Sequence, residues 1–379
     1  MALKPATIPA MLAARIAAQG GDIVLRKKDH GIWKATTWSQ LGARVRELAA
    51  GLKAIGFRPG DVACVIAGTR PEWAHIDLGI LTAGGVSGGL HLDQDADSLG
   101  QALRDSRCRV LFVEGEEQLD TALLVRDRCP ALERIVVIDM KGLRDFTDPN
   151  CESLQAFGAR GAGAGDWGAD IAAIDAGQPA VLLLPRTGAS RTLTHGDALH
   201  LLANARSLLS LRAGDERLAL LPMCHVMERV LGLYLSLDAG MISNYLENPD
   251  TMIENLQEVQ PTVLATDAGI WQALHARIAA ASAAATPLQR ALYRGAIAAG
   301  ARGGAVAALA RFTVLRAVRR DLGLGRLRVA YVGGATLNPD IERWAAALGI
   351  TIRNIDGQAV RGTALDARYQ ALMDEAYVT

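Results

Sequence analysis

The chain lacks a charge imbalance and has few aromatic residues. Its 379 residues contain 40 Lys+Arg and 40 Asp+Glu, which gives a formal net charge of zero, and only 4% are Phe, Trp or Tyr. General nucleic-acid binders are usually basic, and disordered chains have a low apolar content, whereas half of these residues are hydrophobic. We therefore expect a folded protein with a large core that does not bind nucleic acid.

Long hydrophobic runs and cysteine motifs are also absent from the sequence. No uninterrupted apolar run reaches the length of about 18 residues that a transmembrane helix requires. Residues 1–19 lack the continuous apolar stretch of a signal peptide, because Arg15 interrupts it. The five cysteines are widely spaced and form no CxxC pair, which argues against a zinc site and a disulfide framework. These features predict a cytoplasmic protein.

Short apolar runs alternate with helical patterns along most of the chain. A helix is expected over 38–55, where apolar residues recur at spacings of three and four, with Thr37 before its first turn and Gly56 after its end. A second helix is expected over 71–83. The expected strands start at Asp61, Arg109, Arg134, Pro179, Arg217, Pro261, Leu327 and Gly349. Such apolar runs between helices are typical of parallel strands buried on both faces, so the pattern predicts an α/β fold.

Two stretches interrupt this pattern. Residues 157–168 are rich in Gly and Ala, which predicts a flexible loop, and residues 277–325 are rich in Ala and predict helices. From Arg290 to Arg328 the sequence has nine arginines and one acidic residue, Asp321. Such a segment is either a solvated helical face or a patch for an acidic partner, a membrane surface or a nucleotide tail.

Three segments at strand ends have residues that suit ligand contacts. The stretch 182–195 (LLLPRTGASRTLTH) is either an ordinary loop or a phosphate-binding junction between a strand and a helix. His225, in LPMCHVMER, is either a general base or substrate-positioning group or a hydrogen-bonded histidine at a strand end. In 332–344 two glycines permit a close approach to a ligand or form a plain turn, and Asn338 or Asp340 starts a helix. Spacing alone identifies neither a catalytic triad nor a metal cluster.

Six segments of the chain, in the same order, resemble the large N-terminal domain of adenylate-forming enzymes (the AMP-binding family), and within it bacterial long-chain fatty acyl-CoA synthetases. The segments are 38–61, 70–86, 105–114, 221–230, 261–278 and 327–352. Such enzymes use ATP and magnesium to convert a carboxylate into an acyl-adenylate, and they transfer the acyl group to coenzyme A. The resemblance therefore implies an acid–thiol ligase that acts on a fatty acid, with ATP, magnesium and CoA as its cofactors.

The resemblance also implies a domain organisation. Residues 1–360 would form an acyl-CoA synthetase-like N-terminal domain of two mostly parallel β-sheets sandwiched between helices (layered αβαβα), and 361–379 a short C-terminal tail. The domain would have two interleaved lobes, one over about 70–210 and the other over about 20–70 and 211–355. The family's β-barrel and small C-terminal domain are expected to be missing, which leaves apolar surface for a second copy or another chain to cover.

Matching of the family's motifs assigns roles to individual residues. His225 falls at the family's histidine near the acyl carboxylate, which implies substrate positioning. The positions that match nucleotide-binding motifs are Thr187, Gly188, Ser190, Arg191, Thr192, Gly333, Gly334, Ala335, Asp356 and Gly357. The positions around Gly333 also wall the acyl pocket in the family, so an acyl tunnel is expected to persist.

Several of the family's functional residues are replaced in this sequence. The phosphate loop is shorter between Gly188 and Leu193 than the family's pattern and lacks its lysine, so fewer backbone N–H groups face phosphate. Val360 stands where the family has the glutamate that holds magnesium, and its side chain offers no oxygen ligand. Asp356 replaces the tyrosine that packs against adenine, and it would repel the phosphates. Only 19 residues follow Val360, so the aspartate for ribose, the hinge and the lysine-bearing small domain are expected to be absent.

These departures leave three hypotheses for the function. The first is a pseudoenzyme, a synthetase homologue that no longer adenylates but retains acyl binding, alone or in a homo- or hetero-oligomer. The second is an active long-chain fatty acid–CoA ligase with altered loops or a C-terminal domain supplied by a partner. The third is a truncated remnant without function. Apolar periodicity continues through Ile355, which argues against the remnant. The replaced motif residues favour the first hypothesis over the second, and peripheral membrane contact through Arg290 to Arg328 is a further expectation.

Overall fold

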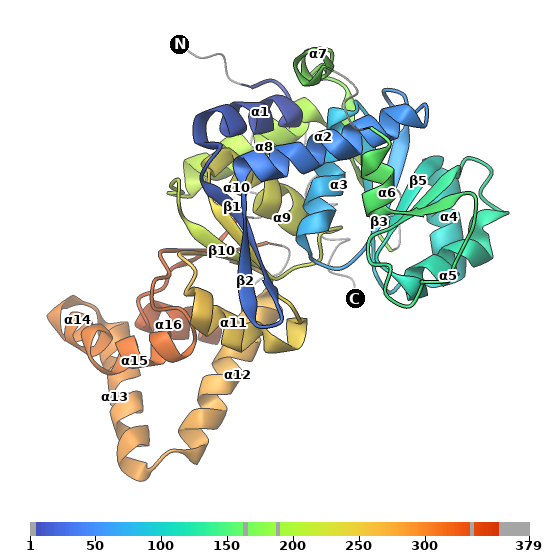
Figure 1. Ribbon diagram of the computed structural model, residues 1–379. Coiled ribbons are helices and arrows are strands. Elements are labelled where there is room, and N and C mark those ends of the chain that lie inside the picture. Colours follow the sequence, from blue (N-terminus) through green and yellow to red (C-terminus); the bar gives the residue numbers. More distant parts are fainter. Residues whose placement is uncertain (1–4, 162–165, 187–189, 334–336, 356–379) are drawn as a thin grey trace. The chain divides into compact units, whose positions relative to one another are not determined.

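The computed structural model describes residues 5–161, 166–186, 190–333 and 337–355 (Figure 1). The helices are α1 (Ile8–Gln19), α2 (Trp38–Ala54), α3 (Pro71–Thr82), α4 (Ala96–Ser106), α5 (Glu116–Arg126), α6 (Leu154–Ala159), α7 (Trp167–Ala172), α8 (His195–Leu208), α9 (Val226–Glu228), the π-helix η1 (Arg229–Tyr234), α10 (Leu235–Ala239), the 3₁₀-helix η2 (Pro249–Thr251), α11 (Met252–Val259), α12 (Ala268–Ala284), α13 (Pro287–Arg302), α14 (Gly304–Phe312), α15 (Val314–Asp321) and α16 (Pro339–Ala347). The strands are β1 (Ile23–Asp29), β2 (Ile32–Thr37), β3 (Val62–Ile66), β4 (Val86–Leu90), β5 (Cys108–Val113), β6 (Arg134–Val137), β7 (Cys151–Ser153), β8 (Pro179–Leu183), β9 (Arg191–Thr194), β10 (Glu216–Ala219), β11 (Ile242–Tyr245), β12 (Val263–Thr266), β13 (Val329–Val332) and β14 (Ile352–Asn354).

The chain divides by compactness into two units that interleave in sequence. Unit 1 comprises 1–27, 33–203 and 222–238, and unit 2 comprises 28–32, 204–221 and 239–379. Helix α2 belongs to unit 1, because it packs against α3 and α6. The lobes that the sequence indicates, with boundaries near residues 70 and 210, stay a prediction.

Unit 1 is built on a seven-stranded sheet with the order β7-β6-β5-β3-β4-β8-β9. The pairs of this sheet are parallel, except that β9 runs antiparallel to β8. Helices α4 and α5 contribute Leu99, Leu119 and Val125 to its buried core. Helices α2 and α3 cross closely because Gly79 lacks a side chain; a Cβ there would lie 2.8 Å from Leu48 Cβ.

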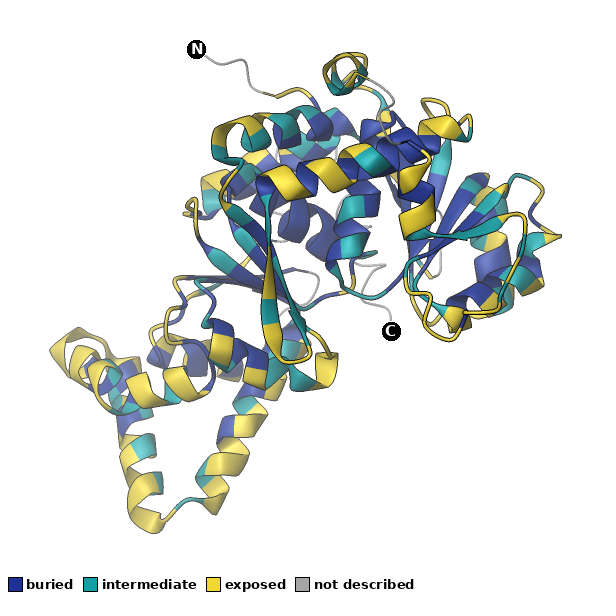
Figure 2. Cartoon of the chain, viewed as in Figure 1, coloured by how far each residue is buried: buried dark blue, intermediate teal, exposed yellow. Residues whose placement is uncertain are grey.

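The second sheet has the order β14-β13-β12-β10-β11-β1-β2, and the pairs among β10 to β14 are parallel. In unit 2 the helices α12, α13 and α14 expose most of their residues (Figure 2). The strands β12 and β13 are buried. The two mostly parallel sheets flanked by helices confirm the predicted α/β fold class. Within the described ranges no helix combines the length and hydropathy needed to cross a bilayer.

Local sequence signals set the ends of helices as expected. The Thr37 hydroxyl accepts from Gln40 N–H at the start of α2, and the Gln40 side chain accepts from Thr37 N–H at 2.8 Å, which forms a capping box. The Asn338 side chain accepts from Asp340 N–H at 2.9 Å and caps α16, whose first residue is Pro339. Both expected helices and all eight expected strands are confirmed.

The flexible loop predicted over 157–168 is wrong at both of its ends. Phe157 lies in α6 and is fully buried, with its ring edge-on to Phe112 at a centroid distance of 5.6 Å. The side chain of Ser153 caps α6, and that of Asp166 caps α7. The two helix caps and the buried Phe157 ring stabilise α6 and α7, although the Gly- and Ala-rich composition favours a loop.

Candidate functional site

His225 begins the short helix α9. Its Nδ1 accepts a hydrogen bond from Met227 N–H at 3.1 Å, so His225 is the N-cap of the helix. Burial lowers the pKa of His225 to about 4, and nearby His91 adds to this shift. The imidazole is therefore neutral at pH 7, with its hydrogen on Nε2 because Nδ1 is an acceptor. A histidine in this state donates a hydrogen bond, which suits substrate positioning better than general-base chemistry.

A buried ion pair fixes the helical segment behind His225. Arg229 Nη2 donates to Asp77 Oδ1 at 2.5 Å, and both side chains are fully buried. Asp77 also accepts from Ser87 Oγ and Tyr234 Oη, each at 2.6 Å. Arg229 donates in addition to the Ser87 carbonyl oxygen at 2.8 Å. This network joins α3, β4 and η1, so it anchors the segment that carries His225 to the core of unit 1.

Arg229 and Tyr234 of this network keep their protons at neutral pH. Burial acts to lower the pKa of Arg229, but the Asp77 carboxylate outweighs it, and the pKa is raised. Burial raises the pKa of Tyr234 well above its usual value, so the phenol keeps the hydrogen that it donates to Asp77. Every buried charge in the network thus has a partner, as burial of charge requires.

The π-helix η1 explains how one segment supplies two donors to Asp77. Arg229 and Tyr234 are five residues apart, and Arg229 Nε donates to Tyr234 Oη at 3.3 Å. An α-helix has 3.6 residues per turn and would turn these side chains away from each other, whereas a π-helix has i→i+5 hydrogen bonds. Because π-helical turns are frequent at functional sites, η1 favours this segment as a candidate site.

The loop before α9 rests on strand β4, where glycine leaves the necessary room. A Cβ on Gly89 would lie 2.8 Å from Cys224 Cα. His91 directly follows β4, and its Nδ1 lies 3.5 Å from Cys224 Sγ. Burial raises the pKa of Cys224 to about 12, so this cysteine is a protonated thiol and not a nucleophile. The sequence pattern does not indicate β4, because Gly88 and Gly89 interrupt its apolar run.

Further polar side chains lie where β4 and β8 end, at the same edge of the sheet. His91 and Asp93 follow β4, and Arg186 follows the adjacent parallel strand β8. Arg186 Nη2 donates to Asp93 Oδ1 at 2.5 Å. Ligands of parallel α/β sheets bind at the carboxyl ends of the strands. The motif analysis missed these three residues; the signal that could have found them is their position directly after strands.

Three residues are expected in a phosphate loop: Ser190 directly precedes strand β9, and Arg191 and Thr192 are its first two residues. Arg191 stands opposite Leu183 of β8 in an antiparallel pair. Strand β9, paired with β8, therefore lies between the expected strand and helix α8, which begins at His195, and phosphate binding by 182–195 stays a prediction. Ser190 and Thr192 are exposed. The Nε of Arg191 is buried and has no hydrogen-bond partner among the described residues.

The other nucleotide-binding candidate within the described residues is Gly333. It is buried and directly follows β13 in unit 2, whereas the three residues where β9 begins and His225 belong to unit 1. The candidates that lie outside the described residues are Thr187, Gly188, Gly334, Ala335, Asp356 and Gly357, together with the magnesium position Val360. Among the candidates that the structure describes, Ser190, Arg191 and Thr192 are consecutive where β9 begins.

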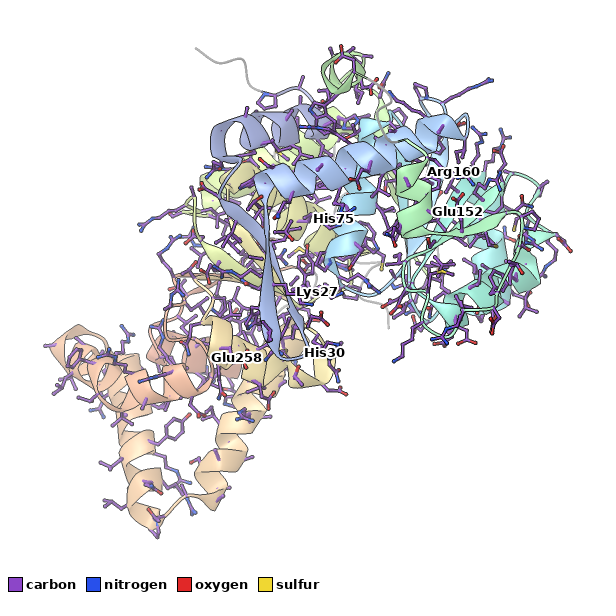
Figure 3. All side chains as sticks on the ribbon, in the orientation of Figure 1. Lys27, His30, His75, Glu152, Arg160 and Glu258 are labelled. Atoms are coloured by element: carbon purple, nitrogen blue, oxygen red, sulfur yellow. The ribbon has the colours of Figure 1, made fainter. Side chains whose placement is uncertain are left out.

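One group of possible metal ligands occurs at the turn between β1 and β2. Asp29, His30 (Figure 3) and Glu247 place ligand atoms within 4.8 Å of one another. The two carboxylate oxygens of Glu247 already accept from His30 N–H at 2.9 Å and Gly31 N–H at 3.1 Å. Glu247 thus stabilises the turn by accepting hydrogen bonds from its backbone, so the group is not assigned as a metal centre.

Comparison with known proteins identifies the family. The family model for AMP-binding enzymes matches residues 12–183 and 191–361. The chain belongs to the AMP-binding enzyme family. It is similar to the long-chain-fatty-acid–CoA ligase FadD15 of Mycobacterium tuberculosis, with 25% identity over 358 residues that cover 90% of this chain and 58% of the relative.

Solved structures share the fold at low sequence identity. The adenylation domain of the carboxylate reductase from Mycobacterium chelonae has a TM-score of 0.70 and 19% identity, over 92% of this chain and 57% of that one. The anthranilate CoA ligase AuaEII in complex with anthranoyl-AMP has a TM-score of 0.68 and 18% identity, over 93% and 60%. The chain thus spans less than two thirds of the length of these AMP-binding relatives.

The residues of this family member fit a nucleotide only in part. The hydroxyls of Ser190 and Thr192 and the guanidinium of Arg191 are donors that suit a phosphate. The family match, however, leaves out 184–190, which joins β8 to β9 and resembles the family's phosphate loop. At Val360, where the resemblance predicts a magnesium ligand, the side chain has no oxygen to offer. No adenylation step follows from these residues.

Proposed function

We propose that this chain binds a long-chain fatty acid and has lost most or all ATP-dependent adenylation. One contrast carries the proposal: the segment around His225 rests on a fully bonded buried network, while the family match is interrupted at 184–190. Val360 in place of a magnesium ligand supports the same contrast. The substrate class rests on the similarity to FadD15, whose name is that of a long-chain-fatty-acid–CoA ligase.

His225 positions the fatty acid carboxylate in this proposal. Its Nε2–H donates to one carboxylate oxygen, while the bond from Met227 N–H to Nδ1 fixes the ring. Hydrogen bonds to charged groups contribute about 1.5–3 kcal/mol, which corresponds to roughly a tenfold to hundredfold change in affinity. His225 thus binds and orients the carboxylate, and neither the ring nor Cys224 supplies a base or nucleophile.

A second candidate function is an active long-chain fatty acid–CoA ligase with altered loops or a C-terminal domain supplied by a partner. One observation favours it, the buried Arg191 Nε that lacks a partner among the described residues. A guanidinium in that state suits a phosphate oxygen of ATP. ATP, magnesium and CoA would then be cofactors of this chain.

Ligand binding and turnover separate these candidates. We expect palmitate to raise the melting temperature of the purified chain and ATP with magnesium to leave it unchanged, because only a ligand of the native state stabilises it. With ATP, magnesium and palmitate, pyrophosphate release is expected to stay at the level of the His225→Ala variant. Release well above that level, and lowered by Arg191→Gln, would establish the active ligase. A chain without a cooperative melting transition would indicate a remnant.

We propose in addition that the basic segment contacts the surface of an anionic membrane. Four of its nine arginines donate to backbone carbonyl oxygens and thus hold the fold together: Arg290, Arg311, Arg319 and Arg328. Arg316 instead lies over the exposed ring of Phe312, with 5.7 Å between the guanidinium carbon and the ring centroid. Exposed large apolar side chains accompany it on α13 and α14: Leu288, Leu292, Val306, Leu309 and Phe312. Apolar and basic side chains together are typical of interfacial helices.

Phe312→Asp is expected to reduce co-sedimentation with vesicles of anionic phospholipid several-fold, because it replaces an inserted ring by a repelled charge. Leu124→Asp is the matched control, since Leu124 on α5 is 74% exposed and Phe312 71%. The control is expected to leave binding unchanged. An equal loss in both variants, or equal binding of the unaltered chain to neutral vesicles, would contradict this membrane contact.

A further inference from the structure

Two adjoining cavities open between helices α12 and α13 of unit 2, and neither involves a residue assigned above to the acyl or nucleotide site. Their volumes are about 360 and 380 Å³, and both are lined by His275, Tyr293 and Arg294. Figure 1 shows α12 and α13 diverging from the turn that joins them, and α16 contacts both helices. Pockets of about 300–1,000 Å³ are typical of small-molecule sites. We refer to the two cavities as the α12–α13 groove.

Arg294 is the uncommitted cation of this groove. It is exposed and makes no hydrogen bond or ion pair with another described residue. The neighbouring arginines are occupied: Arg290 donates to carbonyl oxygens at the end of α12, and Arg343 is paired with Asp340. A guanidinium without a partner, at the mouth of a cavity, is an anion-binding group.

Tyr293 places a second donor beside this cation. Its hydroxyl oxygen accepts from Trp344 Nε1 at 3.1 Å, so the hydroxyl hydrogen points elsewhere and is available to a ligand. Burial raises the pKa of Tyr293, which keeps the phenol protonated at neutral pH. The ring of His275 meets Trp344 edge-on at a centroid distance of 5.1 Å, and this contact holds the indole in place.

The remaining walls of the groove combine small apolar side chains with polar ones. The apolar residues are Ala279 and Ala283 of α12, Ile297, Ala298 and Ala301 of α13, and Trp344 of α16, and the polar ones are Ser282, Arg290, Asp340 and Arg343. Small side chains on facing helices leave a trough rather than interlocking, and an aliphatic chain can bury its surface there. Tyr293 and Arg294 line both cavities, so the cationic and hydrogen-bonding groups lie where the cavities adjoin, and alanine-lined surface extends from them in both cavities.

We propose that the α12–α13 groove binds a long-chain carboxylate, with the carboxylate on Arg294 and Tyr293 and the alkyl chain along the alanine-lined walls. One guanidinium and one hydroxyl donor match the two oxygens of a single carboxylate. The groove lies in unit 2 and His225 in unit 1, so this accessory site does not depend on the proposed function.

Competition with a fluorescent fatty acid tests the proposal. Titration of the full chain with dodecanoate, without vesicles, is expected to reveal two classes of site. Arg294→Gln is expected to weaken one class at least tenfold and Tyr293→Phe about threefold, while His225→Ala weakens only the other. Arg302→Gln is the matched control, an exposed arginine on the same helix, and it is expected to change neither class. Dodecanol has the alkyl chain without the carboxylate, and acetate has the carboxylate without the chain. Both are expected to bind the groove at least tenfold more weakly than dodecanoate.

The outcomes separate this inference from the proposed function. A single class of site that His225→Ala weakens and Arg294→Gln leaves unchanged overturns the accessory site and retains the proposed function. A single class of site that Arg294→Gln weakens and His225→Ala leaves unchanged overturns the proposed function and retains the accessory site. If Arg302→Gln weakens binding as much as Arg294→Gln, the effect is one of general charge and the accessory site is overturned. Equal binding of dodecanol and dodecanoate also overturns it.

Discussion

Replacement of Arg229 by Met is expected to lower the free energy of unfolding by about 3–5 kcal/mol. The loss arises less from the strength of the ion pair than from the charge left behind. Asp77 would remain fully buried, with only the hydroxyls of Ser87 and Tyr234 as donors. An uncompensated buried carboxylate is costly, because neither water nor a cation replaces the guanidinium. Urea unfolding at pH 7 measures the change.

Arg109→Met is the matched control for this loss. Arg109 also pairs with two carboxylates, Asp61 and Glu133, but at the surface, where 22% of its own side chain is exposed. Removal of such a pair is expected to change the unfolding free energy by less than about 1 kcal/mol. A similar loss for Arg109→Met and Arg229→Met would show that burial is not the deciding factor.

A double-variant cycle isolates the coupling within the buried pair. Asp77→Asn together with Arg229→Met removes both charges at once, so its loss is expected to fall short of the summed single losses by about 1–3 kcal/mol. Strictly additive losses would mean that Asp77 and Arg229 do not act as a pair. The hydroxyl donors of Ser87 and Tyr234 remain in every variant and cancel in the comparison.

The regular elements of the fold could be predicted because their signals are local. The capping box of Thr37 and Gln40 occupies four consecutive residues, and Asn338 with Pro339 marks the start of α16 just as directly. Strand β4 could not be predicted from its apolar pattern, because Gly88 and Gly89 interrupt that pattern. Both positions lack room for a side chain, since Cys64 packs against Gly88 and Cys224 against Gly89. The glycines that make this strand hard to predict are thus the residues that permit its close packing against the two cysteines.

The buried network lay beyond sequence reasoning for a different reason. Asp77 and Arg229 are 152 residues apart, and their pairing depends on the register of η1, which no local pattern predicts. One signal was available, since Asp77 falls within a predicted helix whose other residues are largely apolar. A carboxylate on such a helix requires a buried partner. The sequence pointed to His225 through the family resemblance, but its tautomer follows only from the bond to Met227.

Lowering the pH from 7 to 5 is expected to reduce the free energy of unfolding by about 2 kcal/mol through His195 alone. His195 begins α8, is 1% exposed, and accepts from Ile8 N–H on Nδ1 at 3.4 Å. Burial lowers its pKa to about 4. The unfolded chain therefore binds the proton first. The stability from neutral His195 is present above pH 6.5 and is lost as the pH falls toward 4.

His195→Gln is expected to shrink the difference in unfolding free energy between pH 7 and pH 5 by about 2 kcal/mol, whatever its effect at pH 7. His200→Gln is the control, because His200 lies on the same helix but is exposed. Its pH dependence is expected to match that of the unaltered chain. Some dependence remains in both variants, since burial also lowers the pKa of His225 to about 4. An unchanged pH difference in His195→Gln would show that this histidine binds protons equally in the folded and unfolded chains, which would contradict the prediction.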